Sequence, residues 1–303
     1  MAKARTADLA RGKWRGILLT LGVDKSFLTG KHGPCPFCGG DDRFRFDNKD
    51  GDGTFICSQC GAGNGFAFLH RIKGWDFKTA AYEVDKVVGN IGYEKPKPKL
   101  TESARKRILN DMWKAGKRIS AGDPVSLYLE GRGCDLPQNI DCLRFVAQCQ
   151  VPNEAGCRPA MVAMISTVDG KPANLHRTFI TPQGRKADME HPRATMPGEI
   201  PDGSAIRLAM HGERLGIAEG IETALKAGKR FGLPVWAAIN ATMLEKWEPP
   251  EGVREVWVFG DNDPTFTGHK ASYALANRLV VRRKIVTHVE IPPVVGTDWA
   301  DAA

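Results

Sequence analysis

The chain has 303 residues, of which 42% are hydrophobic and 26% charged, as in an ordinary globular protein. Lys and Arg outnumber Asp and Glu by 43 to 35, and residues 1–100 carry most of the excess. A polyanion such as nucleic acid is therefore the first partner to consider. No apolar run approaches the ~20 residues of a membrane span, and the basic N-terminus lacks the apolar stretch of a signal peptide. We therefore expect a cytoplasmic protein with no membrane partner.

The N-terminal third combines short strands, a helix and a linker. Residues 43–46 and 54–56 have the pattern of two strands joined by a turn, and residues 77–88 place apolar side chains at helical spacing. Residues 93–101 alternate Pro with Lys, which disfavours helix and packing. We therefore predict a first domain over residues 1–92 and an extended linker over residues 93–101.

Beyond the linker, the hydrophobic pattern divides into two parts. Residues 102–212 are predicted to contain two helices and a β-hairpin, an α+β arrangement. Residues 213–303 alternate strands with helices, which predicts an α/β domain with a mostly parallel sheet flanked by helices. The expected helices are 102–121, 124–131, 222–231 and 270–281, and the expected strands are 161–168, 173–180, 215–218, 235–239, 255–259 and 285–291.

Two Cys-x-x-Cys pairs stand in the first domain. Cys35 and Cys38 are separated by eighteen residues from Cys57 and Cys60, and the hairpin between them can bring the pairs together. Four thiolates suit zinc, and four protein ligands leave no open position, so we predict one structural Zn²⁺ in a small β ribbon. The other four cysteines form no such pair and are expected to be buried thiols rather than a second metal site; they are Cys134, Cys142, Cys149 and Cys157.

Basic residues flank the first Cys pair. In the run Arg43-Phe-Arg45-Phe, strand geometry places both Arg on one face and both Phe on the other. The Phe side chains would either stack on bases or pack the ribbon core, and the Arg side chains would either contact phosphates or be merely solvated. We favour only the two Arg as nucleic-acid contacts, and Lys31 and His32 carry the same ambiguity.

Carboxylates follow two of the predicted parallel strands. Glu219 comes directly after residues 215–218, and Asp261 and Asp263 follow residues 255–259. The carboxyl ends of parallel strands share one edge of the sheet, where ligands bind in open α/β folds. Carboxylates there can hold Mg²⁺ with waters and substrate phosphate, although Asp-Asn-Asp-Pro is also good turn and cap chemistry.

Two further acids lie close to these positions in the chain. Asp298 follows the last predicted strand and could add a carboxylate to a metal site. Glu222, three residues after Glu219, is expected to interact with the helix dipole in a first helical turn.

The motifs resemble those of DNA primases. Residues 216–225 (GIAEGIETAL) with residues 259–263 (FGDND) resemble a Toprim domain, the metal-binding module of primases, topoisomerases and some nucleases. Residues 31–46 with the second Cys pair resemble the zinc ribbon of primases and primase–helicases from phages and plasmids. Residues 175–186 look like the segment before Toprim in those primases, and residues 296–301 look like their closing acidic motif. The chain is therefore similar to a phage- or plasmid-type, DnaG-like primase without the fused helicase.

The resemblance implies a nucleotidyltransferase that makes short RNA primers, and it implies replication of a mobile element as the setting. It implies Glu219, Asp261 and Asp263 as catalytic residues that hold Mg²⁺ or Mn²⁺, with Asp298 as a further metal ligand. The partners implied are a single-stranded DNA template and ribonucleoside triphosphates. Because no Walker A motif is present, unwinding is expected from a separately encoded replicative helicase.

The resemblance also divides the region after the linker. Residues 102–212 would form the N-terminal subdomain of the polymerase core, and residues 213–303 the Toprim catalytic subdomain. Arg177 and Lys186 would contact triphosphate or template phosphate, with ordinary exposed cations on a hairpin as the alternative.

Three other functions stay open at this point. A Toprim nuclease would use the same acids to hydrolyse DNA. A RecR-like recombination mediator also combines four Cys with Toprim but acts as a non-enzymatic clamp on DNA, and a degenerate primase could serve only as a loader. Nucleotide incorporation would distinguish the primase from all of these.

Overall fold

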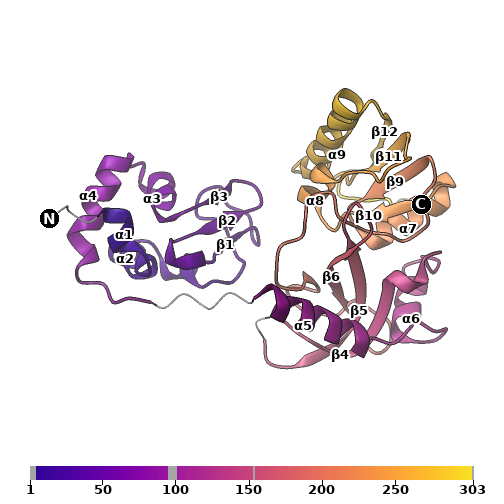
Figure 1. The fold of residues 1–303 in the computed structure, drawn as a ribbon, viewed down its shortest axis with the longest axis horizontal. Coiled ribbons are helices and arrows are strands. Elements are labelled where there is room, and N and C mark those ends of the chain that lie inside the picture. The colour runs from indigo at the N-terminus through magenta and orange to yellow at the C-terminus, as the bar shows by residue number, and fades with distance from the viewer. Residues whose placement is uncertain (1–4, 95–100, 153, 302–303) are drawn as a thin grey trace. The chain divides into compact units, whose positions relative to one another are not determined.

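A computed structural model describes residues 5–94, 101–152 and 154–301 (Figure 1). The chain divides into two compact units, residues 1–100 and 101–303. Residues 95–100 of the expected linker lie outside the described residues, whereas Glu94 belongs to the first unit, since its N–H donates to Gly12 O at 2.6 Å. In the described part of the chain, no helix has both the length and the apolar character needed to span a membrane.

The N-terminal unit packs helices against a three-stranded antiparallel ribbon. The helix expected at residues 77–88 is confirmed, and Asp76 caps it by accepting a hydrogen bond from Thr79 N (2.7 Å). Aromatic side chains from ribbon and helices share one core. The elements are α1 (Thr6–Ala10), α2 (Trp14–Thr20), η1 (Lys25–Leu28), β1 (Phe44–Phe46), η2 (Lys49–Gly51), β2 (Phe55–Cys57), β3 (Gly61–Gly63), α3 (Gly65–Lys73) and α4 (Phe77–Val88).

The second unit is built on one mixed sheet. Its described strands follow the order β12-β11-β9-β10-β8-β5-β6-β7, with β4 paired to β5. Strands β12, β11, β9 and β10 are parallel, and the rest are antiparallel. The strands are β4 (Leu143–Gln150), β5 (Cys157–Ser166), β6 (Pro172–Phe179), β7 (Arg193–Thr195), β8 (Ala205–Ile206), β9 (Arg214–Ala218), β10 (Val235–Ala237), β11 (Glu255–Phe259) and β12 (Val286–Glu290).

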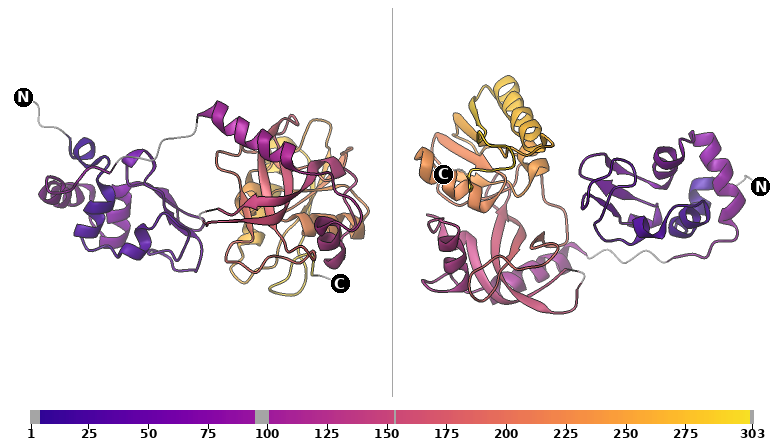
Figure 2. Two further views of the ribbon diagram at one scale, coloured as in Figure 1. Left: turned by 90° about the horizontal axis from the view of Figure 1, so that it is seen from below. Right: turned by 180° about the vertical axis from the view of Figure 1, so that it is seen from behind.

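Helices cover both faces of this sheet. Residues of β5 alternate between two cores: Met161 and Ala163 face α6 and α7, while Ala160 and Val162 face the side where α5 packs. Figure 2 shows α5, in magenta, crossing the antiparallel strands. Helices α8 and α9 cover the parallel strands on the face opposite α7. The helices are α5 (Glu102–Ala115), α6 (Pro124–Gly131), α7 (Ile221–Phe231), α8 (Ala241–Lys246) and α9 (Thr267–Arg278), with short turns η3 (Ile140–Cys142) and η4 (Leu279–Arg283).

The expected fold class is confirmed, with differences at element ends. The helix expected over 102–121 ends at Ala115, and the strand expected over 235–239 ends at Ala237. Strand β4 was not predicted, because its apolar residues do not alternate strictly and a bulge lies between Val146 and Cys149. The expected boundary at 212/213 falls between β8 and β9, which belong to the same sheet.

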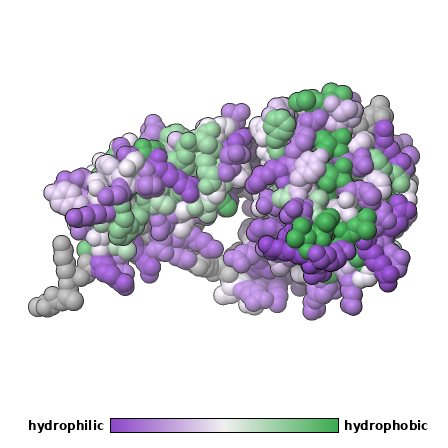
Figure 3. Space-filling view, turned by 90° about the horizontal axis from the view of Figure 1, so that it is seen from above, coloured by the Kyte–Doolittle hydropathy of each residue, from purple (hydrophilic) through white to green (hydrophobic). Residues whose placement is uncertain are grey.

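The surface of the second unit is mixed. Figure 3 shows apolar patches in green among hydrophilic side chains in purple. Exposed apolar residues of this unit include Val280, Val281 and Val286. Such residues are common on protein surfaces. The charged groups that could bind a ligand or take part in catalysis lie elsewhere, at the carboxyl ends of the parallel strands.

Candidate functional site

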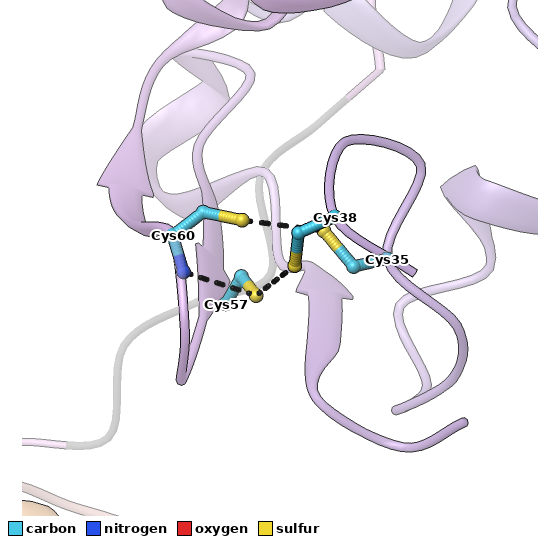
Figure 4. A group of neighbouring side chains, drawn as sticks. All are labelled: Cys35, Cys38, Cys57 and Cys60. Carbon is cyan, nitrogen blue, oxygen red and sulfur yellow. Dashed lines mark hydrogen bonds between the residues drawn. The ribbon is translucent and has the colours of Figure 1, made fainter. Parts of the chain in front are cut away.

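The four paired cysteines converge in the ribbon. Their Sγ atoms all lie within 4.8 Å of one another, with Cys35 and Cys60 3.7 Å apart and Cys38 and Cys57 3.8 Å apart (Figure 4). Sulfurs at ~2.3 Å from a tetrahedral zinc are ~3.8 Å from one another. The four cysteines therefore form a zinc-ribbon site whose dimensions suit structural Zn²⁺.

Backbone N–H groups support the sulfurs of this site. Phe37 N donates to Cys35 Sγ and Cys60 N donates to Cys57 Sγ, each at 3.4 Å. Such bonds favour the charged thiolate, which is the form that binds metal. Arg71 of α3 fixes the second knuckle, because its guanidinium donates to Cys60 O at 3.2 Å and lies 5.1 Å from the Phe55 ring centroid.

The aromatic residues of the ribbon are structural. Phe44 and Phe46 are buried in the core of the first unit, which decides the choice between packing and base stacking in favour of packing. Arg45, on the other face of β1, places Nη1 3.5 Å from His32 Nε2. The neighbouring Lys31 is exposed. The ribbon thus offers basic groups, but no free aromatic face on β1.

Of the other four cysteines, Cys134, Cys142 and Cys149 are buried, and Cys157 is exposed. Within the described residues, the ribbon set is the only group of three or more Cys, His, Asp or Glu side chains whose ligand atoms all lie within 4.8 Å of one another. Burial raises the pKa of the Cys142 thiol to about 12, which makes it chemically inert.

The predicted acids emerge at one edge of the parallel strands. Ala218 of β9 lies opposite Phe259 of β11 in the parallel register, so the residues that follow them leave the sheet side by side. These residues are Glu219 on one strand, and Gly260 with Asp261 on the other. The register therefore brings two carboxylates together from positions more than forty residues apart in the sequence.

The C-terminal segment returns to the same edge. Asn262 N donates to Thr297 O (3.0 Å), and Gly296 N donates to Asn262 O (2.6 Å). This short bridge places Asp298 beside the acidic loop. Asp298 Oδ1 accepts hydrogen bonds from Ala300 N (2.5 Å) and Asp301 N (3.2 Å), so it also closes a turn.

The acidic groups act on one another electrostatically. Burial, followed by the charges of Asp261, Asp263 and Asp298, raises the pKa of Glu219 to about 8. Burial, followed by Asp298 and Asp263, raises the pKa of Asp261 to about 7. Asp261 Oδ1 is buried and has no hydrogen-bond partner among the described residues. A divalent cation bound there would relieve this repulsion and give the unpartnered oxygen a partner.

Asp263 differs from Asp261 in its surroundings. Its Oδ1 accepts from the N–H groups of Thr265 (3.0 Å) and Thr267 (3.2 Å), and its Oδ2 accepts from Gly268 N (2.6 Å). Although burial opposes it, a hydrogen bond from the Thr265 hydroxyl, followed by these backbone hydrogen bonds, lowers the pKa of Asp263. Asp263 thus caps the start of α9, the alternative role that its sequence context allows.

A strained loop lies next to Glu219. Ile239 has φ of 86°, a conformation that a β-branched residue rarely adopts and that costs ~1–3 kcal/mol. Its N–H donates to Glu219 O at 2.7 Å, and the Ala241 N–H acts to lower the pKa of Glu219. The strained turn therefore ties the chain to Glu219 and ends the strand that was predicted to run to Ile239.

A basic cavity of about 470 Å³ lies between α6, the turn after β6, and β7. Among the residues that line it are Arg132, Arg185, Lys186 and Arg193. Gly184 carries the turn close to α6: its φ is 71°, and a Cβ there would lie 2.5 Å from Leu127 Cβ. Four cations around one cavity fit a phosphate-bearing ligand.

Arg177 does not reach this cavity wall. It is buried, and its Nη1 and Nη2 donate to Gln150 O (3.0 Å) and Thr195 O (2.9 Å). These bonds tie the strands around β6 together. Arg177 is therefore a buried structural residue, neither the phosphate contact nor the exposed hairpin cation that the sequence suggested. Its neighbour His176 is also buried, and burial lowers its pKa to about 4.

Arg132 and Arg193, two further residues of the candidate site, were not predicted from the sequence. Arg132 Nη2 lies 3.5 Å from Asp301 Oδ1 and also lines the basic cavity. Arg193 pairs with the buried Glu222 at 3.0 Å. Neither Arg stands in a local pattern that marks it, because its partners are contributed by distant parts of the chain.

Family models match three segments of the chain. Residues 30–66 match the zinc-binding domain of primase-helicase, and residues 214–303 match the Toprim domain. Residues 103–208 match a domain of unknown function, DUF7146.

Solved structures of primases are also similar to this chain. The zinc-binding and RNA polymerase domains of Aquifex aeolicus primase are 16% identical over 99% of this chain and 82% of that one, with a TM-score of 0.44. The primase fragment of the bacteriophage T7 primase-helicase protein is 15% identical over 89% and 92%, with a TM-score of 0.40. The E. coli primase catalytic core is 14% identical over 64% and 74%, with a TM-score of 0.43. The chain combines a zinc ribbon of the primase type near its N-terminus with a C-terminal Toprim domain.

Proposed function

We propose that this chain is a DNA primase, which joins ribonucleoside triphosphates into short RNA primers on a single-stranded DNA template. The observation that carries the proposal is the combination of a primase-type zinc ribbon with a Toprim domain. The acids at the strand ends and the basic cavity of the same unit support it. The resemblance of the motifs to those of phage and plasmid primases would set this activity in replication of a mobile element, with unwinding by a separately encoded helicase.

Asp261, Asp263 and Glu219 would hold Mg²⁺ or Mn²⁺, with Asp298 as further support. The unpartnered Asp261 Oδ1 and the mutual repulsion of the acids agree with such a cation. When bound, the metal would lower the pKa of the primer 3′-hydroxyl and balance charge on the attacked phosphate.

The protein's own groups would bind the nucleotide and move one proton. The 3′-oxygen forms a bond to the α-phosphorus, pyrophosphate leaves, and the hydroxyl proton passes to a base. Glu219, where it does not ligate the metal, would accept this proton. Lys186, Arg132 and Arg193 line the cavity in which the triphosphate would lie.

The ribbon would contact the template. Arg43, Arg45, Lys31 and His32 provide the basic groups for phosphate contacts there. Binding of single-stranded DNA to the ribbon should therefore weaken with rising salt and depend on its zinc.

Primer synthesis tests the proposal directly. The full chain is incubated with mixed-sequence single-stranded DNA, labelled ribonucleotides and Mg²⁺ or Mn²⁺, beside Asp261→Asn and the exposed-acid control Asp188→Asn. We expect short template-dependent RNA from the wild type and the control but none from Asp261→Asn. Bound DNA without product under either metal would refute the polymerase and favour a clamp or loader, whereas cleaved template would favour a Toprim nuclease.

A further inference from the structure

Glu222 differs from the acids at the strand ends because its carboxylate is buried and has protein partners. Its side chain, in the first turn of α7, is only 4% exposed. Its Oε1 accepts a hydrogen bond from the Tyr128 hydroxyl of α6 and another from Arg193 Nη2 at 3.0 Å. Burial alone would raise the pKa of Glu222, but the Arg193 charge and the Tyr128 hydrogen bond outweigh it and hold the pKa below its ordinary value. Glu222 is thus a charged group engaged inside the protein.

Arg193 has one side in the protein and one side open. Its side chain is 44% exposed, in contrast to that of its partner Glu222. It lines the basic cavity together with Lys186, and its charge acts to lower the pKa of Asp261. Arg193 therefore lines the cavity and is near enough to the acids at the strand ends for its charge to act on Asp261.

The hydrogen bonds among Tyr128, Glu222 and Arg193 explain how the Arg193 side chain keeps one orientation. Arg193 begins β7, a strand of three residues at the end of the sheet, where the backbone alone gives little control over a long side chain. The bond to Glu222 uses one of the five N–H donors of the guanidinium and leaves others for a ligand. Tyr128 fixes the carboxylate itself, because its ring is buried against the core.

We propose that Glu222 is a positioning residue: with Tyr128 it holds Arg193 at the boundary of the basic cavity and the acids, where Arg193 contacts a phosphate group of a nucleoside triphosphate. The identity of this ligand rests on the proposed function. A planar guanidinium fork held in place matches phosphate oxygens with two parallel hydrogen bonds, which a freely rotating side chain loses entropy to form. Glu222 thus supports nucleotide binding without contacting nucleotide or metal.

Nucleotide binding without catalysis tests this role. The affinity of the full chain for a fluorescent ATP analogue is measured by anisotropy with Mg²⁺ but without template. Glu222→Gln keeps the shape and removes the charge, and we expect about tenfold weaker binding, as for Arg193→Gln. The double variant should bind about as weakly as either single one, because both changes remove the same contact. Glu248→Gln, which breaks the Arg278 pair elsewhere in this unit, serves as the matched control and should bind like wild type.

Two further measurements separate positioning from other roles. Mn²⁺ binding, followed by electron paramagnetic resonance, should be unchanged in Glu222→Gln and reduced in Asp261→Asn. If Glu222→Gln does not fold, Tyr128→Phe keeps the buried ring, loses only the hydroxyl, and should still weaken nucleotide binding. Where primers are made, KM for nucleotides should rise about tenfold with kcat changed less than threefold.

The outcomes distinguish this inference from the proposed function. Nucleotide binding that depends on Glu222 in a chain that makes no primers would uphold the positioning role and refute the polymerase. Wild-type-like affinity in both Glu222→Gln and Tyr128→Phe, loss of Mn²⁺ in Glu222→Gln, or no nucleotide binding by the wild type would each overturn the positioning role, even for an active primase.

Discussion

Replacing Asp261 with Asn should make the protein more stable while removing its proposed activity. The pKa of Asp261 is about 7 in the folded chain against an ordinary 3.8, because burial and then the charges of Asp298 and Asp263 oppose its ionisation. When folding raises the pKa of an acid in this way, the free energy of unfolding falls as pH rises from about 4 to about 7, and the whole loss remains at higher pH. Asn has the same shape and no charge, so it removes this cost at pH 8.

The size of the effect follows from the shift. About three pKa units at ~1.4 kcal/mol each give an upper limit of ~4 kcal/mol. Because Asp261 is partly exposed, water reduces the repulsion, and we take ~2 kcal/mol as the expected gain. For a unit of this size, that corresponds to a rise of ~4–8 °C in Tm. The gain should shrink at pH 5, where Asp261 is protonated in the folded chain.

Differential scanning calorimetry of the full chain without added Mg²⁺ measures this gain. The transition of residues 101–303 is identified as the one that Cys60→Ser leaves unchanged, and Asp188→Asn controls for loss of a surface charge. Adding Mg²⁺ to ten times its Kd should stabilise the wild type by ~1.4 kcal/mol and Asp261→Asn by much less. A lower Tm for Asp261→Asn at pH 8, or an equal Mg²⁺ response, would contradict the assignment of Asp261 to a cation site.

Three other predictions concern stability. His176 has a folded pKa of about 4 against an ordinary 6.5, so the unfolded chain binds a proton at this residue at higher pH than the folded chain does, and stability falls below pH 6.5. In urea unfolding, His176→Gln should remove ~2 kcal/mol of the stability lost between pH 6.5 and 5. Cys60→Ser should increase hydrogen exchange across residues 30–66, since the ribbon depends on its metal. Asp263→Ala should increase exchange at the start of α9 by losing ~1–2 kcal/mol of capping, and Asp263→Asn, which keeps Oδ1, should lose less. Unchanged pH dependence or exchange in these variants would contradict the corresponding roles.

Local patterns predicted the regular elements well. The helices at residues 77–88 and 124–131 and the strand at 255–259 have the bounds expected from the sequence, because caps or apolar periodicity mark both ends. Asp123, for example, accepts from Val125 N and Ser126 N at 2.9 Å, and Pro124 follows it. Strand β8 has only two residues and takes its place from pairing with β5 and β10, so no local pattern could reveal it.

The candidate site was predictable where the chemistry follows directly after a strand. Glu219 and Asp261 gather because β9 and β11 are parallel neighbours, a relation that alternating strands and helices already imply. The Tyr128–Glu222 contact joins residues 94 positions apart and depends on how α6 packs against α7, which no local pattern encodes. Arg177 shows the converse: its residue type suggested a phosphate contact, but its place within β6 buries it among backbone carbonyls.

The acids at the strand ends are not equivalent, and hydrogen bonding explains why. Asp263 and Asp298 each accept backbone N–H groups, which stabilise their charge and hold their loops in place. Asp261 has a buried oxygen with no such donor, and neighbouring acids raise its pKa. A carboxylate with these features destabilises the fold unless a cation compensates it. The fold therefore stabilises the charges of Asp263 and Asp298 by itself and leaves Asp261, like Glu219, with a raised pKa, which is why we expect cation binding at these two residues to be coupled to folding stability.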